Sequence, residues 1–335
     1  MTKLPPMILN KFRLMLLFIA FFTFACDKSS NNTSNTTPTT ANTDDSVIIE
    51  VNPTHFLTTG LTESITKVSQ TLADGSSVMC YKIVSNNTPS DHTQGPWCPT
   101  NINDGIDKGG IWFEAGKLYD VDGPFIKNLA TFYSNTTWKL YNSTTGTINV
   151  TDTKAACEAA ARPNVDPLYK NYCVQCLPSY FPGIKKIYYI PVKPVKSKNT
   201  IAIMGIGGVV GIAFNGINFD PPAPTQAILG AYTLAPFDDA GGHVNGATGY
   251  HYHAATGKST KIKQSDAHAA MIGYAMDGYG LYENLDESGK ESTDLDASRG
   301  HYDSKRGYHY HVATAGANSF ISSFRGVPGT FSVTL

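Results

Sequence analysis

The stretch Gly249–His253 reads Gly-Tyr-His-Tyr-His, and the same five residues occur again as Gly307–His311. The two copies start 58 positions apart, at 249 and 307, and their flanks match at the same offset. Ten of nineteen positions are identical between 238–256 and 296–314, with the shared pattern D-x3-G-H-x5-G-Y-H-Y-H-x-A-T. A pattern that recurs over such a length indicates a duplicated structural unit.

The repeat extends upstream to two short apolar segments, Gly211–Gly216 and Gly273–Gly278, which end in Asn-Gly and Asp-Gly. Each unit reads as an apolar strand, a turn, a variable loop and then the Gly-His and YHYH segment. The units run over about 205–258 and 266–318. The sequence therefore predicts a mainly β fold with one or two short helices, whose C-terminal half is built from an internally duplicated unit carrying YHYH strands.

The alternation of tyrosine and histidine points to metal chemistry, because residues i and i+2 of a strand lie on the same face. The two histidines of each YHYH segment then share one face, and a Gly-His precedes each pair. Neutral imidazole binds Zn, Cu or Fe, so we expect a divalent transition metal, whose identity the sequence leaves open. The predicted ligands are His243, His251, His253, His301, His309 and His311.

Other side chains are placed to ligate the metal or to orient its ligands. They are His268, Asp277, Asp238, Asp296 and His92. The alternative is that each histidine is only a hydrogen-bonded strand residue. Seven of the nine histidines lie between residues 243 and 311, which favours a site.

Two geometries are open for that site. Each unit can carry its own three-histidine set, or the units can pair about a pseudo-twofold axis and bring both H-x-H strands to one centre. We favour the single centre, because a unit of about 55 residues is small to hold a rigid site alone.

These residues also carry a family resemblance. The paired G-Y-H-Y-H segments, the A-x-[ND]-G turns and the Gly-His spacing resemble the YHYH domain family of bacterial envelope proteins. In the first half, Asn87–His92, Gly109–Trp112 and Tyr119–Gly123 are similar to that family too. The resemblance covers most of the chain after residue 80, and it implies the domain without a settled activity.

The composition of the 335-residue chain narrows its class. The net charge is −1, so the chain has no basic footprint for nucleic acid. Only 16% of the residues are charged, while Gly, Tyr and Phe are plentiful, as in a β-rich extracytoplasmic protein. No nucleophile elbow, phosphate loop, dinucleotide fingerprint or H-E-x-x-H helix occurs in the sequence.

The N-terminus has the features of a targeting segment. Basic residues precede an apolar run over Leu14–Ala25, which is too short to span a bilayer but suits a signal peptide over 1–25. Ala25-Cys26 resembles a bacterial lipobox, and the polar, low-complexity stretch over 26–46 reads as a tether. We expect lipidation of Cys26, a membrane anchor and location in the cell envelope. The alternative is an ordinary signal peptide with an incidental cysteine.

Five other cysteines remain: Cys80, Cys98, Cys157, Cys173 and Cys176. An oxidising envelope favours pairing, and an odd number leaves at least one cysteine over. Cys173 and Cys176, which form a C-x-x-C segment, can form a redox pair or half of a metal site. Structural bridges to Cys157 or Cys98 are the favoured interpretation.

The domain organisation follows from coarse signals. A β-rich first half spans 47–198, and the duplicated half spans 199–335, with both expected in one compact domain. Strands are expected at 47–51, 78–84, 111–113, 138–141, 147–150 and 187–192. Helices are expected at 152–162 and 166–172, and a Pro/Lys-rich linker at 191–198.

Three functions are compatible with these features. The first is a cell-envelope lipoprotein that holds or senses a metal through its histidines. The second is a metalloenzyme, for hydrolysis or redox work, in which the same histidines leave a coordination position open. The third is a non-catalytic surface module whose histidines are structural. Clusters that leave an open face favour an enzyme, closed clusters favour binding or structure, and scattered histidines favour the surface module.

Overall fold

The computed structural model describes residues 47–162, 164–203 and 208–334, which belong to one compact unit. The predicted signal peptide, Cys26 and the tether up to residue 46 lie outside the described residues. Within the described part of the chain, no helix is long and apolar enough to cross a membrane.

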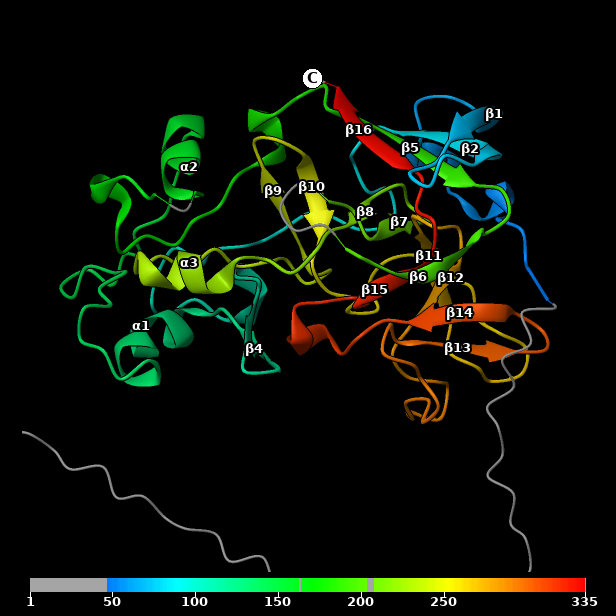
Figure 1. The fold of residues 1–335 in the computed structure, drawn as a ribbon. Helices are drawn as coiled ribbons and strands as arrows, with labels where there is room; N and C mark the ends of the chain where they lie inside the picture. The colour runs from blue at the N-terminus through cyan, green and yellow to red at the C-terminus, as the bar shows by residue number, and fades with distance from the viewer. Residues whose placement is uncertain (1–46, 163, 204–207, 335) are drawn as a thin grey trace, which may run out of the picture. The chain divides into compact units, whose positions relative to one another are not determined.

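The described residues are mainly β, as the repeat pattern predicts (Figure 1). The α-helices are α1 (Gly123–Phe132), α2 (Lys154–Ala160) and α3 (Thr225–Gly230). The strands of the first half and its junction are β1 (Thr66–Thr71), β2 (Ser77–Ser85), β3 (Ile111–Glu114), β4 (Lys117–Asp120), β5 (Lys185–Pro191) and β6 (Lys196–Ala202). The later strands are β7 (Gly211–Ala213), β8 (Asn218–Phe219), β9 (Gly242–Asn245), β10 (Gly249–Tyr252), β11 (Met271–Ala275), β12 (Gly280–Tyr282), β13 (Gly300–Asp303), β14 (Gly307–His311), β15 (Ser323–Gly326) and β16 (Thr330–Thr334).

One eight-stranded sheet contains both repeat units, in the order β13-β14-β12-β11-β7-β8-β10-β9. Counted from the seam between β7 and β11, which pair antiparallel, both directions give the same series of elements. Each direction ends in an antiparallel hairpin whose outer strand carries the Gly-His and whose inner strand carries the YHYH. This symmetric order is what two equivalent units paired about an approximate twofold axis produce.

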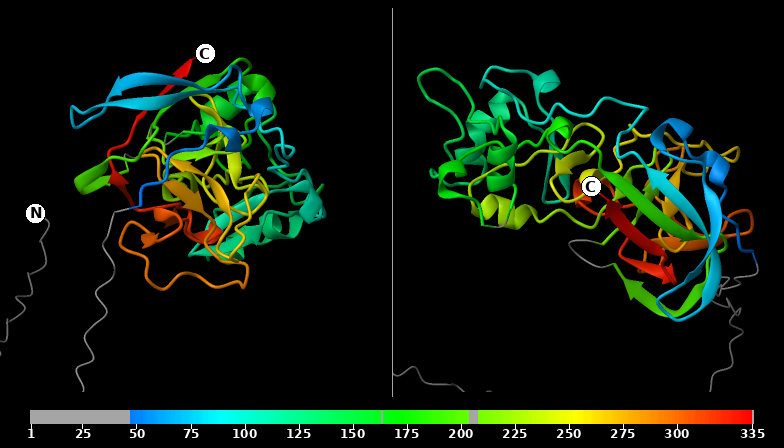
Figure 2. Two further views of the ribbon diagram at one scale, coloured as in Figure 1. Left: turned by 90° about the vertical axis from the view of Figure 1, so that its right-hand side faces the viewer. Right: turned by 90° about the horizontal axis from the view of Figure 1, so that it is seen from above.

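A second sheet joins the two halves of the chain. Its order is β1-β2-β5-β16, so the last strand of the described chain pairs with a strand that precedes the repeats. Two further pairs, β3 with β4 and β6 with β15, are separate ribbons. Seen from two directions, α1, α2 and α3 gather beside β3 and β4 at one side, with the sheets beyond them (Figures 1 and 2).

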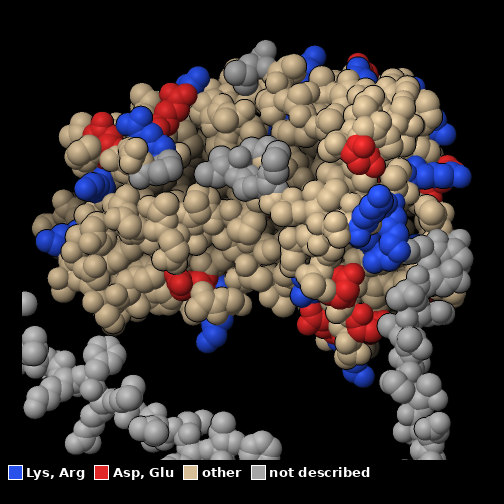
Figure 3. Space-filling model, viewed as in Figure 1, with Lys and Arg blue, Asp and Glu red and all other residues tan. Residues whose placement is uncertain are grey.

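The core has two main parts, one among the sheets and one beside α1. The larger one packs the sheets together and contains the repeated tyrosines. The other packs α1 against β3 and the segment around Phe237, with Trp112, Ile126 and Leu129 buried. On the face shown in Figure 3, the charged side chains lie mainly towards the periphery, and much of the centre is uncharged.

Several expected elements of the first half need correction. The expected strands at 78–84, 111–113 and 187–192 match β2, β3 and β5, and the helix at 152–162 contains α2, capped by the Thr153 side chain. The segment 47–51 is not a strand, 138–141 and 147–150 form only isolated bridges, and 166–172 holds a single 3-10 turn. The expected linker contains the start of β6. Two helices were not expected from the sequence: α1, which begins after the capping residue Asp122, and α3.

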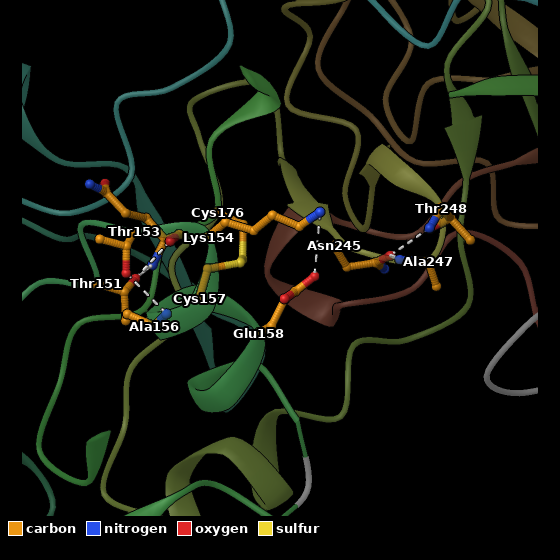
Figure 4. Close-up of a disulfide and its surroundings, with 11 residues drawn as sticks. Thr151, Thr153, Lys154, Ala156, Cys157, Glu158, Cys176, Asn245, Ala247 and Thr248 are labelled. Carbon is orange, nitrogen blue, oxygen red and sulfur yellow. Dashed lines mark hydrogen bonds and ion pairs between the residues drawn. A yellow bond between two sulfur atoms is a disulfide. The ribbon is translucent and has the colours of Figure 1, made fainter. Parts of the chain in front are cut away.

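The cysteines of the C-x-x-C segment form two structural bridges, as the favoured interpretation holds. Cys173 pairs with Cys98, and Cys176 pairs with Cys157 of α2. The second bridge fastens α2 beside the turn between β9 and β10, where Asn245 and Thr248 lie (Figure 4). The fifth cysteine, Cys80, is buried and unpaired, and burial raises the pKa of its thiol to about 11. It is therefore an inert core residue.

We predict that the two bridges differ in their effect on stability. In the chain-entropy model, a bridge that spans 75 residues contributes about 4 kcal/mol to the free energy of unfolding, and one that spans 19 residues contributes about 3 kcal/mol. Urea denaturation should therefore show a larger loss for C98A/C173A than for C157A/C176A. The matched control, Cys80→Ala, removes a thiol without opening a loop. An equal loss in all three variants would contradict the role of loop closure.

Candidate metal centres

The first His cluster consists of His243, His251 and His253, on the hairpin of β9 and β10. His243 lies directly opposite His251 in the register, and His253 follows two residues later on the same face. The Nε2 atoms of His243 and His251 lie 3.0 Å apart, and those of His243 and His253 lie 3.2 Å apart. The i, i+2 alternation therefore delivers the convergence that the sequence predicts.

The second His cluster has the same three positions and one more member. His301 of β13 lies opposite His309 of β14, with 2.9 Å between their Nε2 atoms, and His311 is 3.1 Å from His301. His268, from the segment before β11, brings its Nε2 atom within 3.0 Å of that of His309. The ligand atoms of all four rings lie within 4.8 Å of one another.

These spacings fit a metal ion. A bond of about 2.0–2.1 Å to each nitrogen places tetrahedral ligands about 3.3–3.4 Å apart, and octahedral neighbours about 2.8–3.0 Å apart. The spacings of 2.9–3.2 Å between paired Nε2 atoms run from the octahedral range to just below the tetrahedral one. A small shift of the rings would therefore suit either geometry.

The hydrogen bonds of the Nδ1 atoms determine whether the Nε2 atoms, which face one another, can bind a metal. In the second His cluster, every Nδ1 lies within 3.0 Å of an oxygen: the carbonyls of Gly307, Glu283 and Ala269 for His309, His311 and His268, and the carboxylate of Asp294 for His301. Because these oxygens can only accept, each Nδ1 carries the proton and each Nε2 keeps its lone pair. Four lone pairs then face one another, which is unfavourable unless a cation binds them.

The first His cluster repeats this arrangement for two of its rings. Nδ1 of His251 donates to the carbonyl of Gly249 over 2.9 Å, and Nδ1 of His253 donates to that of Pro221 over 2.7 Å. The third ring, His243, packs against Phe237 with 4.8 Å between ring centroids. Hydrogen bonds from the outer nitrogen to backbone carbonyls are typical of metal-binding histidines, because they fix the tautomer and the ring orientation.

Burial favours the neutral form of His251, His253 and His311. It lowers the pKa of His253 and of His311 to about 4, and that of His251 well below its ordinary value, with neighbouring imidazoles adding to the effect for His311 and His251. The neutral ring is the form that coordinates a metal.

The tyrosines occupy the opposite face and bind carboxylates, of which Asp238 and Asp277 are buried. Tyr250 and Tyr308 donate their hydroxyls to Asp238 and Asp296, each over 2.8 Å. Tyr310 donates to Asp277 over 2.6 Å. The three aspartates predicted as metal ligands or orienting residues thus belong to a tyrosine network and not to either His cluster.

His92 belongs to this tyrosine face as well. Its Nε2 atom lies 3.2 Å from the Tyr250 hydroxyl and 3.4 Å from the Tyr252 hydroxyl, and its Nδ1 atom lies 2.7 Å from Asp91. It therefore contacts the back of the hairpin and is not a member of the first His cluster. In contrast, His268, predicted only as an additional residue, lies fully within the second.

The repeated glycines explain how the tyrosine rings reach their partners. A Cβ atom on Gly242 would lie 2.5 Å from the Tyr250 ring, and one on Gly300 would lie 2.1 Å from the Tyr308 hydroxyl. The tyrosine of each inner strand crosses the backbone of the outer strand at these points. Only glycine leaves that space, which accounts for the Gly in each repeated Gly-His.

A buried polar group beside the first His cluster was missed in the sequence analysis. Asp220 places its Oδ2 atom 3.6 Å from Nε2 of His251. Asn218 donates to Asp220 and accepts from the buried Lys186, whose ammonium also donates to the carbonyl of Tyr250 over 2.7 Å. Burial raises the pKa of the Asp220 carboxyl and lowers that of the Lys186 ammonium, while the attraction between their charges opposes both shifts.

The two clusters differ in what surrounds them. All three rings of the first His cluster, together with Asp220, line a pocket of about 410 Å³. Of the second His cluster, His309 alone lines the pocket beside Tyr308. The position that Asp220 has in unit one is taken by Tyr282 in unit two, where its ring packs 5.0 Å from that of His268. An alignment of the two units shows Asp220 opposite Tyr282, and this difference was the sequence signal for Asp220.

The comparison with protein families agrees with this geometry. Residues 187–293 match the model of the YHYH protein family. The chain carries a YHYH domain. The match contains the whole first His cluster, Asp220 and His268, and it ends before the second GYHYH segment. Neither the curated proteins nor the solved structures include a match to this chain.

The prediction of a single centre in the YHYH domain is wrong. The two H-x-H strands belong to hairpins at opposite edges of the eight-stranded sheet, and the histidines form two groups. The physical reason is that the units meet through β7 and β11, the strands farthest from the hairpins. The less favoured geometry, in which each unit carries its own set, is the one that the structure has.

We predict that the tyrosine network stabilises the fold. Tyr310→Phe removes the hydroxyl that binds the fully buried Asp277, so it should lower the free energy of unfolding by about 1–3 kcal/mol. Chemical denaturation measures this, with the partly exposed Tyr141→Phe as a matched control. A loss no greater than that of the control would show that the hydrogen bond contributes nothing to stability.

Proposed function

We propose that this protein is a metalloprotein with two divalent transition-metal centres, one in each His cluster. The observation that carries the proposal is the orientation of six of the seven rings, all except His243: their Nδ1 atoms donate to oxygens. Their Nε2 atoms are therefore unprotonated, and the paired Nε2 atoms of the clusters lie 2.9–3.2 Å apart. Strand packing alone does not require this, because a hydrogen-bonded pair of imidazoles needs one donor. Zinc, copper and iron all accept such ligands.

The two centres would have different roles. The second His cluster supplies four imidazoles, which can fill a tetrahedral shell and suit a structural metal. The first supplies three and faces a pocket, so a metal there would keep a position for water or a ligand. This open position also supports a metalloenzyme as the second candidate function, in which the metal would activate water beside Asp220.

We predict a metal content of two ions per chain, measurable by elemental analysis of the purified protein. H309A/H311A should lose one ion, and H251A/H253A should lose the other. The first pair of changes should also lower thermal stability, since a ligand present at about a thousand times its Kd stabilises the native state by about 4 kcal/mol.

The control for metal content is His55→Ala. His55 stacks on Tyr274, outside both clusters, and the variant should leave both ions bound. Unaltered metal content in both double variants would refute the proposal and leave the histidines as structural residues.

We also propose that the protein is a lipoprotein of the cell envelope, anchored to the membrane through Cys26. The charged N-terminus, the short apolar run and the polar tether support this proposal. The pairing of Cys98 with Cys173 and of Cys157 with Cys176 also supports it, because disulfides persist in oxidising compartments.

The anchor can be tested by Cys26→Ser. The variant should either leave the membrane fraction or accumulate with its signal peptide uncleaved, as seen by fractionation and mass spectrometry. Cys80→Ser, a change at the buried unpaired cysteine, is the matched control and should fractionate like the unchanged protein. Unchanged membrane association and processing of the Cys26→Ser variant would exclude lipidation at this residue.

A further inference from the structure

We propose that the first His cluster and its pocket bind a small apolar molecule that carries one protic oxygen head group. The head group would coordinate the metal, and the hydrocarbon part would fill the pocket. This inference rests on the proposed function, because it requires a metal ion on the three imidazoles.

The first step is that the cluster and the pocket are one site. His243, His251 and His253 all line the pocket, so a metal that they hold would form part of its wall. Three imidazoles leave at least one coordination position, and the pocket is the space into which it opens. At about 410 Å³, the pocket lies within the range of small-molecule sites.

The second step concerns the walls, which are mostly apolar. Side chains from several distant segments line the pocket: Trp97, Val174, Pro221, Ile228, Ala235 and Val244. Among the described residues that line it, the charged ones are Asp220 and Arg162, and Arg162 is exposed. Such a surface favours a hydrocarbon over a sugar or a phosphate ester.

The third step concerns the head group. Asp220 lies 3.6 Å from Nε2 of His251, so its carboxylate lies beside any group on the metal. Its position is fixed by Asn218, which the buried Lys186 holds in turn. A head group that keeps an N–H or O–H proton when its oxygen binds the metal can donate a hydrogen bond to Asp220, whereas a carboxylate head has no proton to donate. Hydroxamic acids and alcohols therefore match the site better than fatty acids.

The fourth step is that the pocket is held open by covalent structure. Ala160 and Arg162 at the end of α2, together with Cys176, line one part of the pocket. The bridge between Cys157 and Cys176 joins the two segments that carry these residues (Figure 4). A site with a fastened wall binds with little loss of conformational entropy.

The experiment compares two hydroxamic acids on the zinc-loaded full chain by calorimetry. Octanohydroxamic acid should bind at least about tenfold more tightly than acetohydroxamic acid, because the longer chain buries additional CH₂ groups in the pocket. Octanoic acid should bind at least about tenfold more weakly than octanohydroxamic acid. H251A/H253A should abolish binding of both hydroxamic acids, and H309A/H311A should retain it.

Three variants test the walls and Asp220 at unchanged metal content. Ala227→Trp places a large ring into the pocket from the exposed side of α3 and should remove the advantage of the longer chain. Its matched control is Gln226→Trp, one residue earlier, which lies at a different pocket and should keep that advantage. Asp220→Asn should weaken octanohydroxamic acid about tenfold while octanoic acid gains or holds its affinity.

The possible failures are distinguishable. Absence of zinc from the three-imidazole site, read by elemental analysis, would overturn the proposed function and this inference with it. Zinc bound normally with equal affinity for the short and long hydroxamic acids would overturn the apolar-ligand inference alone. Equal weakening by Ala227→Trp and Gln226→Trp would do the same.

Discussion

The hydrogen bond from the Nδ1 atom of an imidazole to a fixed oxygen is the interaction on which the candidate sites depend. Without it, the rings could rotate or exchange tautomers, and the inner nitrogens would not be lone-pair donors. The acceptors of His251 and His309 are carbonyls two residues earlier in the same pentapeptide, at Gly249 and Gly307. The YHYH segment therefore orients its own first ligand, while the rest of the fold supplies the acceptors for the others.

The two faces of each hairpin have complementary tasks. Imidazoles converge on one face, and on the other face tyrosine hydroxyls bind buried carboxylates such as Asp277 and Asp238. Because the two sets alternate along one strand, neither can shift by one residue without exchanging faces. The tyrosine network thus fixes the register that aligns the histidines, which explains why aspartate recurs in the pattern without touching a metal ligand.

The sequence was informative where the determining contacts are local. The alternation in Gly249–His253 predicts which histidines converge, and the repeat predicts that both copies do so. The number of centres was not predictable, because it depends on which strands of the two units pair. Lys186 lies in no motif, and Asp220 stands out only when the two units are compared. Their proximity to His251 comes from strands that are distant in sequence. His268 lies outside the repeated pattern, so the repeat alone does not place it in the second His cluster.

The symmetric strand order has a consequence for the edges of the eight-stranded sheet. Both edges of the eight-stranded sheet are formed by the same kind of strand, β9 and β13, and each is four residues long. An edge strand offers unpaired N–H and C=O groups to any other exposed edge, and short edges limit that pairing. The sheet therefore has two short edges of the same kind. A longer edge strand on either side would favour pairing between molecules, which leads to fibrous assembly.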